Sequence, residues 1–330
     1  MIQKGYGCAF GGGTIINAIA AWKGCAYATE LKTYAEVQLD SDAVPEIRGE
    51  IAGNPDADTK LIEFCVQSIL DQFDCRKKAV VLTKSSIPIA GGLKSSSAAA
   101  NATVIATLDA LGEMLTPEEI VKTGVAAAKA AGVTITGAYD DACASFYGGV
   151  AVTDNREMAL LRQAYFDYDV LVLNPNVKAF SAQTNISRSV LMKDLVETAF
   201  EMALSGDYGK AMKLNGLIYC GALGFDPEPA VSCMEIGEKF GVVCGLSGTG
   251  PSFTALLPKS DTLSAEDAVE LRAVKDEIKA NWTTLFPDGR IYETQTCNRN
   301  ALEESRAFSK YIKDGNLSLR EIDIGSFNFI

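Results

Sequence analysis

One stretch of the chain restricts the possible fold and site more than any other. Residues 87–100 read Ile-Pro-Ile-Ala-Gly-Gly-Leu-Lys-Ser-Ser-Ser-Ala-Ala-Ala, and an Ala-rich run continues to Leu111. The pattern predicts a strand that ends at a proline, then a glycine loop, then a helix that begins at the serines. Glycines allow a ligand close to the backbone, and the free N–H groups of a helix start attract anions. The stretch predicts a phosphate site; the alternative is a serine-capped helix packed tightly on a sheet.

Missing residue types and motifs exclude several kinds of chemistry. The chain contains no histidine, which excludes Ser-His-Asp and Cys-His catalysis, histidine-ligated zinc and histidine bases. The glycine loop lacks the Gly-Lys-Ser/Thr ending of a Walker P-loop. The earlier run Gly11-Gly12-Gly13-Thr14 lacks the third spaced glycine of a dinucleotide-binding fingerprint.

The amino-acid composition and the net charge limit the kinds of partner that this protein can have. The 330 residues are 48% apolar and 22% charged, which is typical of a globular protein long enough for two domains. The net charge of −12 is interrupted by no basic cluster, so we expect neither nucleic acid nor a membrane as a partner. Nine cysteines without a Cys-x-x-Cys pair, together with a start that does not read as a signal peptide, predict a reduced, cytoplasmic protein.

The first half of the chain predicts alternating strands and helices. Apolar residues alternate over 24–39, with Glu30, Lys32 and Glu36 on the opposite face, which predicts a long, half-buried strand. The further elements that we expect here are a helix over 58–73, a short buried strand over 79–83, a helix capped by Thr116 with Pro117 and Glu119 in its first turn, a short helix within 136–149 and a strand over 150–153.

The second half has a different pattern. Its strand-helix-helix-strand-strand-helix-strand order is similar to a ferredoxin-like α+β layer. The elements that we expect are a strand from Tyr168, helices near 190–204 and 208–222, strands over 241–246 and 252–257, a helix over 265–281 and a strand over 290–296. We therefore predict one domain over residues 1–160 and a second over 161–297. Residues 298–330 are highly charged and form either an extra helix or a surface tail.

Two carboxylates stand together in the segment Thr136-Gly-Ala-Tyr-Asp-Asp-Ala-Cys-Ala-Ser-Phe-Tyr-Gly-Gly. Asp140 and Asp141 lie at the start of the predicted short helix. Carboxylates there can simply cap the helix. Adjacent carboxylates flanked by glycines also suit Mg²⁺ binding or base catalysis. The residues alone leave both alternatives open.

A late glycine-rich turn, Leu246-Ser-Gly-Thr-Gly-Pro-Ser, joins two predicted strands. Its Gly-x-Gly-Pro sequence favours a tight hairpin that needs positive φ angles. The alternative is that its N–H groups form a second anion-binding nest beside the first loop.

These three motifs, in this order, resemble those of the GHMP kinase superfamily over about residues 5–297. The phosphate loop of that superfamily reads Pro-x-x-x-Gly-Leu-Gly-Ser-Ser-Ala, and the stretch from Pro88 to Ser97 matches it except that Lys94 replaces a glycine and Ser97 an alanine. Asp141 precedes Gly148 by seven residues, as in the middle motif of the superfamily, and 245–252 match its late turn.

Within the superfamily, the motifs look most like those of the archaeal-type shikimate kinases. The matching segments are Gly13-Thr-Ile-Ile-Asn-Ala-Ile-Ala, Gly92-Leu-Lys-Ser-Ser-Ser-Ala-Ala-Ala-Asn-Ala and Tyr139-Asp-Asp-Ala-Cys-Ala-Ser. Lys94 is expected in that subgroup. The implied fold is α+β, in two layers, with a ribosomal-S5-domain-2-like N-terminal half, a ferredoxin-like C-terminal half and the site between them.

The resemblance implies ATP-dependent phosphorylation of shikimate to shikimate 3-phosphate, with Mg²⁺, in aromatic amino acid (chorismate) biosynthesis. It implies Asp141 as the group that accepts or orients the hydroxyl proton, with Asp140 as the alternative. Lys94 would either add a positive charge near the phosphates or point to solvent. Thr14 and Asn17 would face the substrate, and Ser96 would contact Mg²⁺ and phosphate. The implied nucleotide-binding residues are Pro88, Gly91, Gly92, Leu93, Lys94, Ser95, Ser96, Ser97, Gly248 and Gly250.

Some alternatives remain open at this stage. The carboxylate of shikimate needs a cation, for which Lys23, Lys178 and Arg188 are candidates. Two rival functions are another GHMP small-molecule kinase, such as homoserine kinase, and a GHMP-fold sensor that binds ATP and a metabolite without turnover. An intact Ser96 and an intact Asp141 argue against the sensor. Neither the oligomeric state nor the preferred metal can be predicted from the residues.

Overall fold

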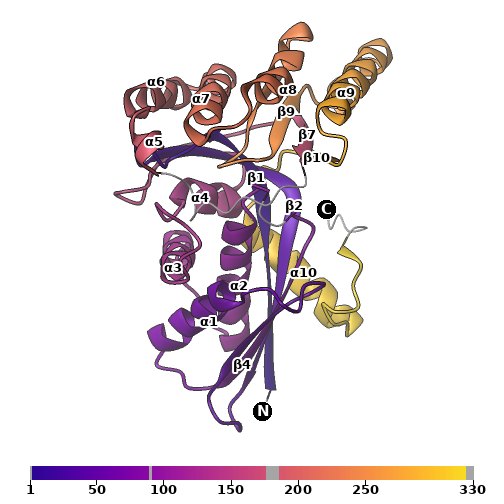
Figure 1. Cartoon of the computed structure of the whole chain (residues 1–330). Coiled ribbons are helices and arrows are strands. Elements are labelled where there is room, and N and C mark those ends of the chain that lie inside the picture. The colour runs from indigo at the N-terminus through magenta and orange to yellow at the C-terminus, as the bar shows by residue number, and fades with distance from the viewer. Residues whose placement is uncertain (1, 89–90, 176–185, 325–330) are drawn as a thin grey trace.

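The computed structural model describes residues 2–88, 91–175 and 186–324. Figure 1 shows two α+β layers that meet near the middle of the molecule. The first sheet has the order β3-β4-β2-β5-β6, and β1 also pairs with β2. Its strands are β1 (Ile2–Ile16), β2 (Lys23–Asp40), β3 (Ile47–Ile51), β4 (Lys78–Ser85), β5 (Val150–Asp154) and β6 (Ala159–Ala164).

Four helices lie on one side of this sheet and a fifth lies on the other (Figure 1). The four are α1 (Lys60–Gln72), α2 (Ser95–Leu111), α3 (Pro117–Ala130) and α4 (Tyr139–Tyr147), and the fifth is α10 (Ala301–Gly315). The predicted punctuation of α3 is confirmed, because Thr116 and Glu119 form a reciprocal capping box and Pro117 is the first helical residue.

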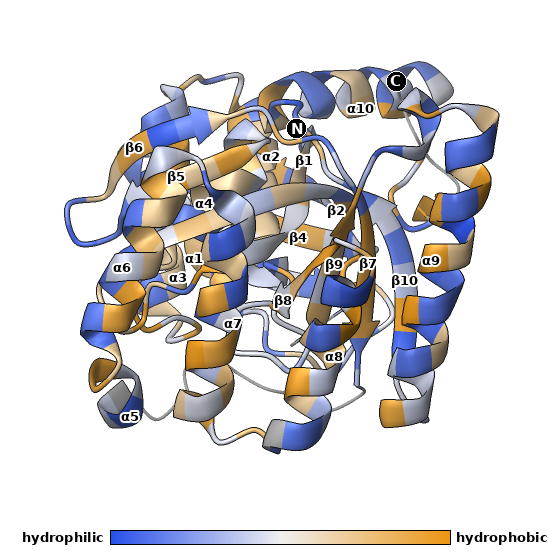
Figure 2. Cartoon of the chain, turned by 90° about the horizontal axis from the view of Figure 1, so that it is seen from above, coloured by the Kyte–Doolittle hydropathy of each residue, from blue (hydrophilic) through white to orange (hydrophobic). Residues whose placement is uncertain are grey.

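The second sheet is antiparallel and has the order β10-β7-β9-β8. Its strands are β7 (Asp169–Asn174), β8 (Val243–Leu246), β9 (Phe253–Leu257) and β10 (Arg290–Gln295). Its helices are α5 (Ile186–Val190), α6 (Lys193–Ser205), α7 (Tyr208–Leu223), α8 (Pro227–Lys239) and α9 (Ala265–Leu285). Figure 2 shows hydrophobic central strands with helices along one side. This arrangement confirms the ferredoxin-like expectation; helix α8 was not expected, although Asp226 caps it and Pro227 begins it.

Strand β1 was also not expected, because glycine is a poor strand former. The structure gives two of its glycines a packing role. A Cβ on Gly5 would lie 2.1 Å from the backbone nitrogen of Ala110, and one on Gly7 would lie 2.1 Å from the carbonyl oxygen of Ala102. Both contacts are with the backbone of α2, so the absence of side chains lets the helix that follows the phosphate loop lie directly on the strand.

The prediction that β2 is half-buried was wrong. Its polar face is covered by α10, which belongs to the C-terminal segment. The side chains of Lys32 and Glu304 are 2% and 0% exposed, and Lys32 Nζ lies 2.5 Å from Glu304 Oε1. Arg299 Nε donates to the other oxygen of Glu304 at 3.0 Å. Charged residues can line a buried strand face only when they are paired in this way, and the partners come from the far end of the chain.

The predicted domain limits stay predictions, although the chain passes from the first sheet to the second between Ala164 and Asp169. The two parts also share an isolated bridge between Thr29 and Thr296. Within the described ranges, no helix has both the length and the apolar character needed to cross a bilayer.

Candidate active site

The phosphate-loop stretch folds as the sequence predicts up to the helix start, but the serines do not cap the helix. Helix α2 begins at Ser95, and its N-cap residue is Lys94, which has a left-handed backbone (φ 65°) and no capping side-chain hydrogen bond. Gly92 is also left-handed, with φ 75°. The alternative of a structural helix capped by the serines is therefore wrong. Ile89 and Ala90 lie outside the described residues.

The backbone polarity of this loop suits an anion. Among the described residues, no acceptor is found for the N–H groups of 91–97. Two loop carbonyls, in contrast, are engaged from outside the loop: Ser247 Oγ donates to the carbonyl of Gly92 at 2.8 Å, and the N–H of Gly12 donates to the carbonyl of Leu93 at 3.1 Å. A run of free N–H groups at the positive end of a long helix is a phosphate-binding arrangement.

A pocket beside the loop brings together residues from distant parts of the chain. It gathers six of the predicted site residues: Thr14, Asn17, Lys94, Asp140, Asp141 and Gly248. The sequence did not single out its other lining residues: Ala18, Ile19, Thr134, Ile135, Thr136, Ala138 and Thr249. The predicted nucleotide residues that do not line it are Pro88, Gly91, Gly92, Leu93, Ser95, Ser96, Ser97 and Gly250. Ser96 is exposed on the first turn of α2.

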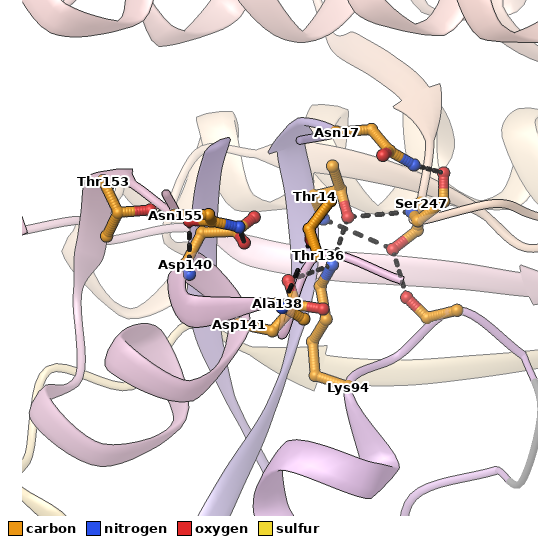
Figure 3. Close-up of polar contacts among 12 residues, drawn as sticks. Thr14, Asn17, Lys94, Thr136, Ala138, Asp140, Asp141, Thr153, Asn155 and Ser247 are labelled. Carbon is orange, nitrogen blue, oxygen red and sulfur yellow. Dashed lines mark hydrogen bonds and ion pairs between the residues drawn. The ribbon is translucent and has the colours of Figure 1, made fainter. Parts of the chain in front are cut away.

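Lys94 joins the phosphate loop to the carboxylate helix. Its side chain is 5% exposed, and its Nζ lies 2.6 Å from Asp141 Oδ1. It also donates a short hydrogen bond to Thr14 Oγ1. Figure 3 shows the ammonium between these two oxygens. Of the two alternatives for Lys94, the solvent-facing one is therefore excluded. Asp141, which is 19% exposed, presents a carboxylate at the pocket.

The neighbouring Asp140 has a different environment. It is buried, and Asn155 Nδ2 donates to its Oδ1 at 2.7 Å, while Asn155 Oδ1 accepts from Thr153 Oγ1 at 2.6 Å. Burial, followed by repulsion from the Asp141 carboxylate, raises the pKa of Asp140 to about 7. Neither carboxylate caps α4, since the N-cap position is Ala138 without a side-chain cap bond. The capping alternative for this pair was wrong.

The late turn is a hairpin between β8 and β9, and it also touches the phosphate loop. The N–H of Gly248 donates to Thr14 Oγ1 at 2.8 Å, and Ser247 Oγ accepts from the N–H of Thr14 at 3.3 Å. A Cβ on Gly92 would lie 2.3 Å from the carbonyl oxygen of Ser247. Glycine is therefore required at 92 both for its φ angle and for this close approach. The hairpin alternative is confirmed, and its role is to brace the site.

Asn17 is held by the second half of the molecule. Its Nδ2 donates to the carbonyl of Gly248 at 2.8 Å, and its Oδ1 accepts from the N–H of Ile19 at 3.0 Å. Its backbone N–H donates to Asn215 Oδ1 at 2.9 Å, and its carbonyl accepts from Tyr219 at 2.9 Å. Most of the hydrogen-bonding capacity of Asn17 is thus used within the protein, so it shapes the pocket more than it offers free groups.

The proposed carboxylate-binding cations are less well placed. Lys23 Nζ lies 5.4 Å from the centroid of the Phe200 ring. Arg188 is exposed and lies near Gly224. Neither lines the pocket, and Lys178 lies outside the described residues. Over the described part of the chain, no three histidine, cysteine or acidic side chains gather to hold a metal. A metal here would need other oxygen ligands, such as the Ser96 hydroxyl and the phosphates themselves.

The fold and this site define a class of protein. Residues 60–149 match the model of the GHMP kinases N-terminal domain. The structure is similar to a homoserine kinase from Cytophaga hutchinsonii, with a TM-score of 0.62 at 14% identity, covering 89% of this chain and 96% of that one. It is also similar to a mevalonate diphosphate decarboxylase from Enterococcus faecalis, with a TM-score of 0.65 at 17% identity over 91% and 98%. The chain has the fold of the GHMP kinases.

Curated relatives narrow the class. A shikimate kinase from Methanosarcina acetivorans is 52% identical over 302 residues, which cover 92% of this chain and 97% of the relative. Shikimate kinases from Methanococcoides burtonii and Halobacterium salinarum are 47% and 42% identical, over 90% and 86% of this chain and 98% and 94% of theirs. The chain belongs to the shikimate kinase family that these archaeal proteins represent, as the motifs predicted.

Proposed function

We propose that this protein transfers the γ-phosphoryl group of ATP to a hydroxyl of shikimate, forming shikimate 3-phosphate for aromatic amino acid biosynthesis. The observation that carries the proposal is the position of Lys94, which begins at the phosphate loop and ends between Thr14 and Asp141. One ammonium thereby connects a site for a phosphate with a carboxylate that can receive a hydroxyl proton. The names of the relatives support the choice of shikimate.

The nucleotide phosphates are assigned to residues 91–97, and Gly248 and Gly250 close this side of the site from the second half. The N–H groups of 91–97, which have no acceptor among the described residues, and the dipole of α2 neutralise phosphate charge without a covalent step. Mg²⁺, when bound with ATP, would offset charge on the phosphate oxygens, and Ser96 is the residue that offers it a hydroxyl. Phosphoryl transfer depends mainly on such positioning and charge neutralisation.

We assign Asp141, rather than Asp140, as the group that accepts the proton of the reacting substrate hydroxyl. Asp141 lies at the pocket beside the Lys94 ammonium, whereas Asp140 is occupied by Asn155 behind it. The Lys94 side chain extends from the phosphate loop, and its ammonium contacts Asp141. It can therefore stabilise negative charge first on the carboxylate and then on the transferred phosphoryl group. Through its hydrogen bonds with Asn155, Asp140 instead ties the start of α4 to the residue that follows β5.

The pocket lining favours a hydroxylated substrate. Threonine hydroxyls at 14, 134, 136 and 249 line it together with neutral and apolar residues. Lys94, Asp140 and Asp141 are its charged lining residues, and the one cation is already paired with Asp141. Homoserine carries an ammonium that would need a further unpaired carboxylate.

All nine cysteines are free, which supports the proposal of a reducing compartment such as the cytoplasm.

A panel of acceptors tests the proposal. We expect ADP release in a coupled assay with MgATP and shikimate, and negligible release with homoserine or mevalonate. Rapid turnover of homoserine without turnover of shikimate would contradict the substrate and leave the kinase class intact. Binding of ATP and shikimate without turnover of any acceptor would instead identify a sensor.

A further inference from the structure

Thr14 lines the pocket, and its hydrogen bonds within the protein restrict which ligand atoms can face it. It lies near the end of β1, is 1% exposed and lines the pocket. A threonine hydroxyl has one proton to donate and two lone pairs to accept with. How the protein uses those three positions decides what kind of ligand atom can face Thr14.

Both accepting positions of Thr14 are already used. The N–H of Gly248 donates to Oγ1 at 2.8 Å, and the Lys94 ammonium donates to the same oxygen. The first donor is a backbone group in a braced turn and the second is a buried lysine, and neither can become an acceptor. Thr14 therefore has only its proton left, and the group that meets it in the pocket must be an acceptor.

The Thr14 hydroxyl lies next to Asp141, the proposed base. Lys94 Nζ touches both Thr14 Oγ1 and Asp141 Oδ1, so only one ammonium separates the two side chains (Figure 3). A substrate whose reacting hydroxyl meets Asp141 therefore brings its adjoining atoms to Thr14. A hydrogen bond donated to the reacting oxygen itself would draw on the lone pair that must attack phosphorus. The donor is better matched by an oxygen on the neighbouring carbon.

We propose that Thr14 donates a hydrogen bond to the hydroxyl oxygen adjacent to the reacting hydroxyl, and that the site thereby selects vicinal diols. This inference rests on the proposed function and adds the reason for its selectivity. In shikimate the hydroxyl that is phosphorylated has one neighbouring hydroxyl on the ring, which would take this place. An ammonium at that place would face a donor, because Thr14 cannot accept from it.

The test compares shikimate with two analogues, one that lacks the neighbouring hydroxyl (the deoxy analogue) and one that carries an amine there (the amino analogue). We expect wild-type kcat/KM to fall about 10- to 100-fold for the deoxy analogue, the effect of leaving a buried donor unpaired. It should fall further for the amino analogue. An amino analogue that is used as well as shikimate would overturn the inference without any variant.

Variants then assign the effect to Thr14. Thr14→Val removes the oxygen that accepts from Gly248 and Lys94, so kcat/KM should fall for both substrates. It should fall about 10- to 100-fold further for shikimate than for the deoxy analogue, so the discrimination disappears. Thr14→Ser should keep it. Thr136→Val is the matched control, because Thr136 lines the same pocket but accepts one hydrogen bond, from the N–H of Ala138; it should also keep the discrimination. Equal losses for both substrates in Thr14→Val would overturn the inference. Wild-type turnover of shikimate, measured in the same series, separates this from a failure of the proposed function.

Discussion

Two buried lysines of this protein make the same kind of contact in different surroundings. Lys32 and Lys94 each have a carboxylate oxygen within 2.6 Å of Nζ, at Glu304 and Asp141. Glu304 is completely enclosed and is also held by Arg299. Asp141 is 19% exposed and borders the pocket. The closed pair can only hold the C-terminal helix on the sheet, whereas the open pair can exchange partners with a ligand. Access to a ligand, rather than charge or distance, separates a structural ion pair from one that can serve catalysis.

The largest effect is expected from breaking the open pair at its carboxylate. Asp141→Asn should lower kcat by about 10²–10⁴, which is the usual contribution of a general base, while binding of MgATP survives because the nucleotide is held by the loop. Steady-state kinetics and nucleotide titration measure the two effects. Asp140→Asn is the matched control and should cost less; if it were the inactive variant while Asp141→Asn stayed mild, the two roles would be exchanged.

The closed pair should show its effect in stability instead. Lys32→Met leaves Glu304 buried without its lysine, and we expect a loss of about 3–5 kcal/mol in the free energy of unfolding. Lys94→Met should lose less, about 1–3 kcal/mol, because Asp141 is partly exposed at the pocket, yet it should lose most of its activity. Urea unfolding and kinetics on both variants measure this difference. Equal stability losses would show that the pocket is as closed to water as the α10 interface.

The effect that is smallest near neutral pH sharpens the contrast between the adjacent carboxylates. The folded-state pKa of Asp140 is raised to about 7, so the folded protein binds a proton that the unfolded chain releases near pH 4. Its contribution to stability is therefore present below about pH 4 and is lost as the pH rises to about 7, by at most about 1.4 kcal/mol per pH unit. Asp140→Asn should lack this slope. The difference in urea midpoint between wild type and variant across that pH range measures it, and a pH-independent difference would contradict the assigned pKa.

Local signals predicted most of the elements, and they failed where distant residues decide the outcome. Caps and periodicity predicted α1, α2, α3 and the order of the second half. Strand β1 was missed because its glycines serve the approach of α2, and the buried face of β2 because its cover comes from α10.

The candidate site followed the same rule. The loop and the carboxylate segment could be found from short motifs, and the pocket brings many of them together. Ser247 could not be found, because its hydrogen bonds reach residues 155 and 233 positions away in the chain. Nor could Asp140 and Asp141 be separated, since neighbours on a helix differ by about 100° in direction and face different environments.

The pairing of Lys32 with Glu304 has a consequence for synthesis of the chain. The two residues lie 272 positions apart, so the lysine leaves the ribosome long before its partner exists. Until α10 is made, the sheet that carries the end of β1 and the phosphate loop has an unpaired charged face and cannot reach its final packing. Domains generally fold as they emerge, N-terminal part first, but here the first layer must wait for α10. Completion of the active site is thereby tied to synthesis of α10, and a chain that stops short of α10 would present an unfinished sheet rather than a partly active enzyme.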